Sequence, residues 1–223
     1  MQSASTTRAA NPVQVTIGSA AVVAGDLAVP DRARGLVIFP HDSVISRSAP
    51  SAQFLADLLY QHDFATLAID LLTEKEQAID ERTGKLRFDM ALLSTRILAI
   101  CSWAQRRERI TGLPVGLFGT NTTAAAALVA ATQQPTGFQT VVSYSGRPDL
   151  AGSALGRVMI PTLFIVGSVD EQWRDLSRRA IERMHNEARL EIVANASELF
   201  EEAAGLDHLG QLSAAWFTER LRN

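Results

Sequence analysis

The sequence predicts a single α/β domain with a mostly parallel central sheet and helices on both faces. Short apolar runs alternate with segments of helical periodicity along most of the chain, and this alternation is typical of parallel sheets. The apolar runs are continuous, as expected of strands that are covered on both faces. The 223 residues are enough for one substantial core, and no linker or shift in composition marks a second domain.

Each expected element follows from local periodicity. Two short strands around Gly18 and Ser19, at 13–17 and 20–29, predict an antiparallel entry to the sheet. The later strands are expected at 36–39, 65–70, 115–118, 140–144, 162–166 and 190–193. Helices are expected at 51–61, at 90–106, from 122 onwards, near 173–185 and at 208–222.

Composition and charge exclude several classes of protein. The formal net charge is −3, and the basic residues are scattered among acids, which argues against a nucleic acid partner. No run of about 18 apolar residues exists to span a bilayer. The first ten residues hold one Arg and no apolar segment, so we expect residues 1–11 to be a disordered start, not a secretion signal. One domain over 12–223 in a cytoplasmic protein follows from these features.

Cys101 is the single cysteine, so the chain can form no internal disulfide and no cysteine-based zinc site. Because it falls within an apolar helical pattern at 97–101, we expect a buried structural thiol. No metal and no cofactor is expected. The polar stretch 73–89, which includes Asp80, is most simply a solvated excursion over the sheet edge, although a cap over a binding site is the alternative.

Asn121 stands where the surrounding sequence calls for a nucleophile. Residues 115–128 form an apolar strand, a tight turn and an Ala-rich helix, which is the frame of a G-x-S-x-G nucleophile elbow without its serine. An amide side chain cannot be converted into an alkoxide or thiolate by a neighbouring base. The pattern therefore predicts the fold and leaves open whether the protein is an enzyme.

The chain resembles the α/β-hydrolase superfamily, and within it small dienelactone hydrolase-like proteins, from roughly residue 36 to the C-terminus. The resemblance depends on six features in order and spacing, namely the His41 loop after a buried strand, the stretch 65–87, the elbow at Gly119, the segment 145–150, the strand that ends before Asp170, and the segment 199–202. It implies a single-domain α/β-hydrolase fold. A shared fold does not by itself imply a shared activity.

The resemblance also implies where a catalytic triad would lie. In that family a serine, an aspartate and a histidine follow in this chain order. The three positions correspond to Asn121, Asp170 and Glu198. Only the orienting carboxylate therefore matches the family, and the nucleophile and the base are both replaced.

Supporting parts of the site differ from the family as well. Thr123 replaces the second glycine of the elbow, so a widened or rearranged turn is expected. Asp42 follows His41 where relatives have His-Gly, and a carboxylate there would disfavour a developing oxyanion. His41, Asp42, Thr122 and Ser145 are expected to line the crevice and oxyanion region, with His41 in a structural role.

Two pairs of interpretations remain open for the triad positions. Asn121 either preserves a turn with positive φ, which Asn tolerates better than most residues, or orients a water or a bound carbonyl. Glu198 either turns outward into solvent or lies beside Asp170, where two like charges raise one pKa or recruit a cation.

Three functional hypotheses follow. The first is a catalytically impaired pseudo-hydrolase that retains a small-molecule crevice. The second is a hydrolase of small esters or lactones in which Glu198 or Asp170 acts as general base. The third is a non-catalytic homo-oligomeric scaffold. A small-molecule ligand and a second copy of the chain, as in a homodimer, are thus the candidate partners.

Overall fold

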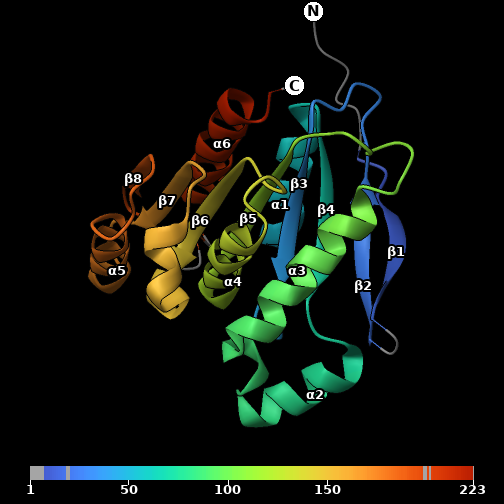
Figure 1. Cartoon of the computed structure of the whole chain (residues 1–223). Coiled ribbons are helices and arrows are strands. Elements are labelled where there is room, and N and C mark those ends of the chain that lie inside the picture. Colours follow the sequence, from blue (N-terminus) through green and yellow to red (C-terminus); the bar gives the residue numbers. More distant parts are fainter. Residues whose placement is uncertain (1–7, 19–20, 198–199, 201, 223) are drawn as a thin grey trace, which may run out of the picture.

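The structure is a computed structural model that describes residues 8–18, 21–197, 200 and 202–222. Its strands are β1 (Asn11–Ile17), β2 (Ala21–Ala28), β3 (Gly35–His41), β4 (Phe64–Asp70), β5 (Val115–Thr120), β6 (Thr140–Gly146), β7 (Thr162–Gly167) and β8 (Ala188–Val193). They form one sheet in the order β1-β2-β4-β3-β5-β6-β7-β8 (Figure 1). β2 pairs antiparallel with β1 and β4, and the other pairs are parallel. The predicted sheet with an antiparallel entry is confirmed.

Helices cover both faces of the sheet. They are α1 (Pro50–Gln61), α2 (Glu74–Thr83), α3 (Met90–Ala104), α4 (Asn121–Gln133), α5 (Glu171–Ile181) and α6 (Ala203–Arg220), with 3₁₀ segments η1 (Leu86–Phe88) and η2 (Pro148–Arg157). One apolar core includes residues of α3, α4 and α5, and a second, on the opposite face, includes residues of α1 and α6. In Figure 1, α3 and α4 lie in front of the sheet and α6 behind it.

Strand β5 holds the functional site in place because it is packed from both sides. All six of its residues are buried, as the continuous apolar run predicts. Phe118 packs edge-on against Phe39 with the ring centres 4.9 Å apart, and it also contacts Tyr144. At Gly116 a Cβ atom would come within 2.6 Å of the Phe217 ring, so only glycine lets α6 approach here.

The N-terminal expectation lies partly outside the described residues, because residues 1–7 are not among them. Asn11, which we assigned to the disordered start, begins β1. Arg8 is nearly buried and donates hydrogen bonds to Asp57 and Gln53 of α1. Ordered structure therefore starts before residue 12. Among the described residues, no helix is both long enough and apolar enough to cross a membrane.

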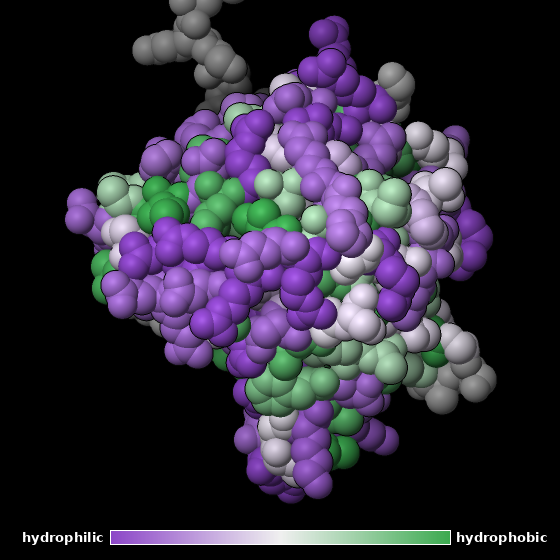
Figure 2. Space-filling view, turned by 60° about the vertical axis from the view of Figure 1, so that its left-hand side comes forward, coloured by the Kyte–Doolittle hydropathy of each residue, from purple (hydrophilic) through white to green (hydrophobic). Residues whose placement is uncertain are grey.

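Helix α2 and the following η1 project beyond the sheet as an arm (Figure 1). The arm is the lower projection in Figure 2, where hydrophilic and hydrophobic residues are mixed on its surface. Ile79 and Phe88 are about half exposed on it. The arm adjoins the carboxyl end of β4, so it extends from the edge of the sheet at which parallel strands of α/β proteins gather ligands.

Candidate functional site at the nucleophile elbow

Asn121 occupies the tip of the turn between β5 and α4. It is the first residue of α4 and has a φ of 45°, which confirms the expected position and backbone conformation. Gly119 lies so close to the helix that a Cβ atom there would be 2.6 Å from Ala124 Cα. The strand-to-helix approach of a nucleophile elbow is therefore present, with a carboxamide at the tip.

The expectation that Thr123 widens this turn is wrong. Strand and helix keep their close approach at Gly119, and Thr123 is 1% exposed beneath the turn. Its hydroxyl donates to the Thr120 carbonyl at 2.8 Å and accepts from the Thr120 N–H at 3.1 Å. A threonine is accommodated because its buried hydroxyl finds both a donor and an acceptor in the backbone of Thr120.

Asp42 is bound to the elbow itself. The Thr122 hydroxyl donates to Asp42 Oδ2 at 2.5 Å, and the Val44 N–H donates to Asp42 Oδ1 at 2.8 Å. Asp42 is 5% exposed and forms no ion pair with a described residue. The start of a helix favours negative charge, so the N-terminus of α4 helps to stabilise this carboxylate. Asp42 and Thr122, which we expected in one crevice region, are thus in direct contact.

His41 has the geometry of a structural residue. Its Nδ1 lies 3.2 Å from the Ile45 carbonyl, and the residue is 5% exposed. Burial lowers the pKa of His41 to about 4, so the ring is neutral near pH 7. A histidine with so low a pKa is a weak general base under these conditions.

The carboxyl end of β6 adjoins the elbow. The Arg147 N–H donates to the Asn121 carbonyl at 2.9 Å, and Gly146 forms a parallel bridge with Asn121. Ser145, the residue before Gly146, is buried and has a φ of 42°. The Arg147 guanidinium forms two hydrogen bonds with Asp149, at 2.9 and 2.6 Å.

The remaining triad positions are only partly described. Asp170 follows β7 and precedes α5, and its Oδ2 is buried without a hydrogen-bond partner among the described residues. Glu198 lies outside the described residues. The expected pairing of Asp170 with Glu198, and the raised pKa that would accompany it, therefore remain predictions.

Asp80 is a buried anchor, contrary to its assignment to a solvated excursion. Its side chain is fully buried and accepts from Ser43 in the loop after β3, from Arg87 Nε at 2.7 Å, and from the Leu86 N–H at 2.6 Å. Burial alone would raise the pKa of Asp80, but the hydrogen bonds from Ser43 and Arg87 lower it overall. The arm is thereby fixed to the loop that carries Asp42. The charged residues of the arm did not indicate in the sequence that Asp80 contacts Ser43.

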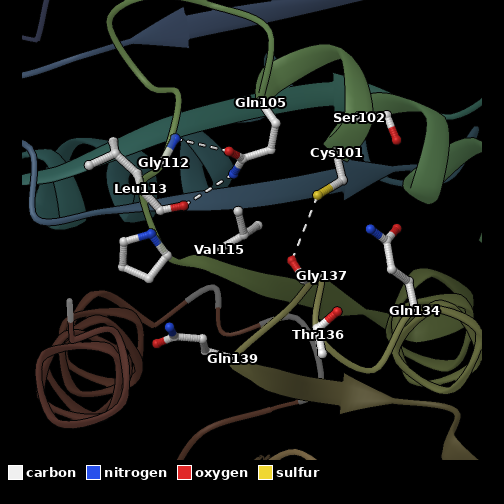
Figure 3. A pocket seen from close by; sticks show the side chains of 11 residues that line it. Cys101, Ser102, Gln105, Gly112, Leu113, Val115, Gln134, Thr136, Gly137 and Gln139 are labelled. Carbon is white, nitrogen blue, oxygen red and sulfur yellow. Dashed lines mark hydrogen bonds between the residues drawn. The ribbon is translucent and has the colours of Figure 1, made fainter.

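A hollow lies at the opposite edge of the sheet, where β5 begins (Figure 3). It has a volume of about 410 Å³ and is lined by uncharged residues of α3 and of the segments that lead into β5 and β6. Gln105 holds one wall by accepting from the Gly112 N–H at 3.0 Å and donating to the Leu113 carbonyl at 3.1 Å. Cys101 is buried here as expected, and burial raises its thiol pKa to about 11. The thiol is therefore protonated and unreactive at neutral pH.

Within the described part of the chain, no three His, Cys, Asp or Glu side chains are grouped so that they could hold a metal ion. The polar groups at the elbow are instead the carboxamide of Asn121, the hydroxyls of Thr122 and Thr123, and the carboxylate of Asp42. Such groups can orient a neutral ligand or a water by hydrogen bonding.

Comparisons with known proteins agree with this geometry. No protein-family model matches the sequence. The structure of a dienelactone hydrolase from Anabaena variabilis is 42% identical, with a TM-score of 0.92, over 97% of this chain and 100% of that chain. A dienelactone hydrolase-like promiscuous phosphotriesterase from metagenomic libraries has a TM-score of 0.76 over 96% and 99% of the two chains, and at 19% identity it supports the fold alone.

Curated relatives from two strains of Mycobacterium tuberculosis are named putative phosphoribosyl transferases. Each is 41% identical over 209 residues, which are 94% of this chain and 46% of the relative. The chain thus spans about half the length of these relatives. The full-length match to the Anabaena structure, at 42% identity, assigns the family. This chain belongs to the dienelactone hydrolase family of α/β-hydrolase-fold proteins.

Proposed function

We propose that this chain is a pseudo-hydrolase that cannot form a covalent acyl intermediate and instead binds a small molecule in the crevice beside the elbow. The observation that carries the proposal is Asn121 at the nucleophile position, with the positive φ and close strand-to-helix approach of a working elbow. The scaffold around the nucleophile is thus kept, while the reacting group is one that cannot attack a carbonyl.

Asp42 supports the same proposal. Hydrolases of this fold stabilise the oxyanion with backbone N–H groups of the residue after the nucleophile and of the loop after β3. Here Asp42 places a buried carboxylate against Thr122, the residue after Asn121. A negative charge at this place would repel the oxyanion of a tetrahedral intermediate.

The direct test measures hydrolysis of p-nitrophenyl acetate and labelling by a fluorophosphonate. Wild type should show neither, because no alkoxide can form at residue 121. A matched comparison is the same assay on the dienelactone hydrolase from Anabaena variabilis. Robust turnover by the wild-type chain that disappears in an Asn121→Ala variant would sink the proposal.

Stepwise repair makes the test sharper. Asn121→Ser alone should yield almost no activity, because a serine without a base stays protonated and a triad acts as a unit. Adding Glu198→His should raise the rate, and adding Asp42→Gly should raise it further by removing the charge beside Thr122. If the single Asn121→Ser variant were as active as the triple variant, another base would already serve the site.

A carboxylate-based hydrolase of small esters or lactones is the second candidate. It is favoured by Asp170, whose buried Oδ2 has no described partner and could accept a proton from water. This mechanism predicts lactone hydrolysis that follows a carboxyl pKa and is lost in Asp170→Asn but not in Asn121→Ala. The absence of lactone turnover in wild type would exclude it.

We further infer that phosphoribosyl transfer, the activity in the names of the curated relatives, belongs to the part of those proteins outside the match. The matched 209 residues correspond to the hydrolase-like domain, which is 46% of each relative. Phosphoribosyl transferase assays on this chain alone should therefore give no product.

A further inference from the structure

The sheet ends in two outer strands, β1 and β8, and these strands differ in composition (Figure 1). An outer strand exposes a row of N–H and C=O groups to which a further strand can bond, and proteins limit such pairing with Pro, Lys or bulges. β1 contains Pro12, which has no N–H to donate. β8 contains neither Pro nor Lys, and its pairing with β7 runs from Ala188 to Val193 without a bulge. The outer edge of β8 is therefore suited to accept another strand.

The hydrogen bonds between β7 and β8 show which backbone groups of β8 face outward. The Thr162 N–H donates to the Glu187 carbonyl at 2.9 Å, and the Ser168 N–H donates to the Val193 carbonyl at the same distance. Because successive residues of a strand bond alternately to its two sides, the odd-numbered residues of β8 bond toward β7. The residues whose N–H and C=O groups point to the open edge are Ala188, Leu190 and Ile192. Outside the sheet, no described backbone group bonds to them.

Two charged side chains of opposite sign lie on the face of β8 that is covered by α6. The Arg189 guanidinium lies over the Trp216 ring of α6, 5.3 Å from its centre, and Glu191, two residues further on, points to the same side of the strand. Arg189 is exposed and reaches Glu187 only at 4.0 Å, whereas Arg220 lies 2.5 Å from that carboxylate. Glu191 forms no ion pair with a described residue. Both charges are thus available to a neighbouring molecule.

We propose that β8 pairs antiparallel with β8 of a second copy of this chain, about a twofold axis that passes through Leu190. In this arrangement Leu190 lies opposite the partner's Leu190, and Arg189 of each chain lies opposite the partner's Glu191. Each outward N–H then meets an outward C=O, since Ala188 and the partner's Ile192 are also opposite. The two sheets join into one continuous sheet, and the elbow is not part of the contact.

The charges of β8 favour this register and this partner. An axis through Arg189 would place two guanidinium groups opposite each other, and an axis through Glu191 would do the same with two carboxylates. Only the axis through Leu190 gives two pairs of opposite charge. It also sets Ile192, which is 41% exposed, against the small side chain of Ala188 on the same face. A strand whose charges are complementary to its own reversed copy indicates a second copy of this chain as the occupant.

Exchange of the two charges tests the register. Arg189→Glu should set carboxylates opposite each other at two symmetric places, and Glu191→Arg should do the same with guanidinium groups, so each change should weaken the dimer about thirtyfold. The double variant Arg189→Glu, Glu191→Arg restores opposite charges and should dimerise within about threefold of wild type. Arg82→Glu, an exposed reversal on α2, is the matched control and should have no effect.

The readout is sedimentation of the full chain over a dilution series. Wild type should reach twice the 24.1 kDa mass of one chain at the higher concentrations. Melting temperatures, measured at a dilution where wild type is monomeric, show that each variant is folded. A fold defect caused by loss of the contact with Trp216 would persist in the double variant, whereas a defect in pairing would be repaired.

Crosslinking tests the position of the axis without a change of charge. Opposite residues in a hydrogen-bonded antiparallel pair have Cα atoms about 5.5 Å apart, which is within reach of a disulfide. Leu190→Cys should therefore form a disulfide with its own copy under mild oxidation. Ile192→Cys should not, because the two copies of that residue are offset by about 13 Å along the strands. Wild type is the control for Cys101, which is buried.

Three results would overturn the proposal. They are a wild-type chain that stays monomeric throughout the dilution series, a double charge variant that dimerises no better than the single ones, and equal crosslinking of Leu190→Cys and Ile192→Cys. A dimer with either of the last two results would use another surface or another register. None of these results bears on the lost nucleophile at Asn121, which is tested by ester turnover.

Discussion

Two buried carboxylates, Asp42 and Asp80, fix neighbouring segments at the edge of the sheet where the parallel strands end. Their hydrogen-bond partners differ. Asp42 is satisfied by a hydroxyl, the N–H groups of its own loop and the start of α4. Asp80 is satisfied by a hydroxyl, two backbone N–H groups and the guanidinium of Arg87. Among the described residues, a cationic side chain pairs with Asp80, and none pairs with Asp42.

The difference has a physical meaning. A buried carboxylate without a cation depends on dipoles, so it is stable only while those dipoles stay aligned. A carboxylate that pairs with Arg also holds a second side chain and the segment that carries it. Asp42 therefore shapes the elbow, whereas Asp80 fixes the whole arm to the loop after β3.

The largest expected effect is that of Asp80→Ala. The change leaves the Arg87 guanidinium and two N–H groups without their acceptor, so it should lower the free energy of unfolding by about 3 kcal/mol. Urea denaturation measures this loss, and hydrogen exchange should show that α2 and η1 lose protection first. Exposed Glu81, on the same helix, is the control, and Glu81→Ala should change stability by less than about 0.5 kcal/mol.

Asp42→Ala should cost less, about 2 kcal/mol, because hydroxyl and N–H donors lose an acceptor but no described cation is left unpaired. Urea denaturation of the two alanine variants under identical conditions gives the comparison. Asp149→Ala removes a more exposed carboxylate from the same edge and should cost at most about 1 kcal/mol. An Asp42 variant less stable than the Asp80 variant would contradict the distinction between the two anchors.

The elbow was predictable from the sequence, because its signals are local. An apolar strand, Gly119, and an Ala-rich helix specify the turn, and they identify Asn121 as the residue at its tip. The sheet was predictable for the same reason, since continuous apolar runs between helical patterns indicate parallel strands. The effect of Thr123 was not predictable, because whether a hydroxyl can bond back to Thr120 depends on the exact turn.

The contact between the arm and the loop after β3 was not predictable from local sequence patterns. Asp80 lies among charged residues that have the composition of a solvated helix, and its partner Ser43 is 37 residues away. No periodicity links these positions, since the contact depends on how the arm folds back onto the sheet. The positive φ of Ser145 was not predictable either, because a serine at the end of a strand does not indicate its backbone conformation.

Acid should weaken the arm through Glu76. Hydrogen bonds from Arg96 lower the pKa of Glu76 from 4.5 to about 2. Because the folded pKa is depressed, this contribution is complete above about pH 4.5 and is lost as pH falls toward 2. The stability difference between wild type and Glu76→Gln at pH 7 should shrink over that window in urea titrations. A difference that stays constant from pH 6 to pH 3 would show that the ion pair does not contribute.

The smallest expected effect tests why Asn stands at the elbow. If the residue is kept only for its backbone, Asn121→Gly should leave the free energy of unfolding within about 0.5 kcal/mol, because glycine adopts a φ of 45° without strain. Asn121→Ala should cost about 1 kcal/mol, since alanine pays for the left-handed conformation. Denaturant unfolding separates the two variants. An Asn121→Gly variant that loses as much stability as Asn121→Ala would show that the carboxamide itself stabilises the turn.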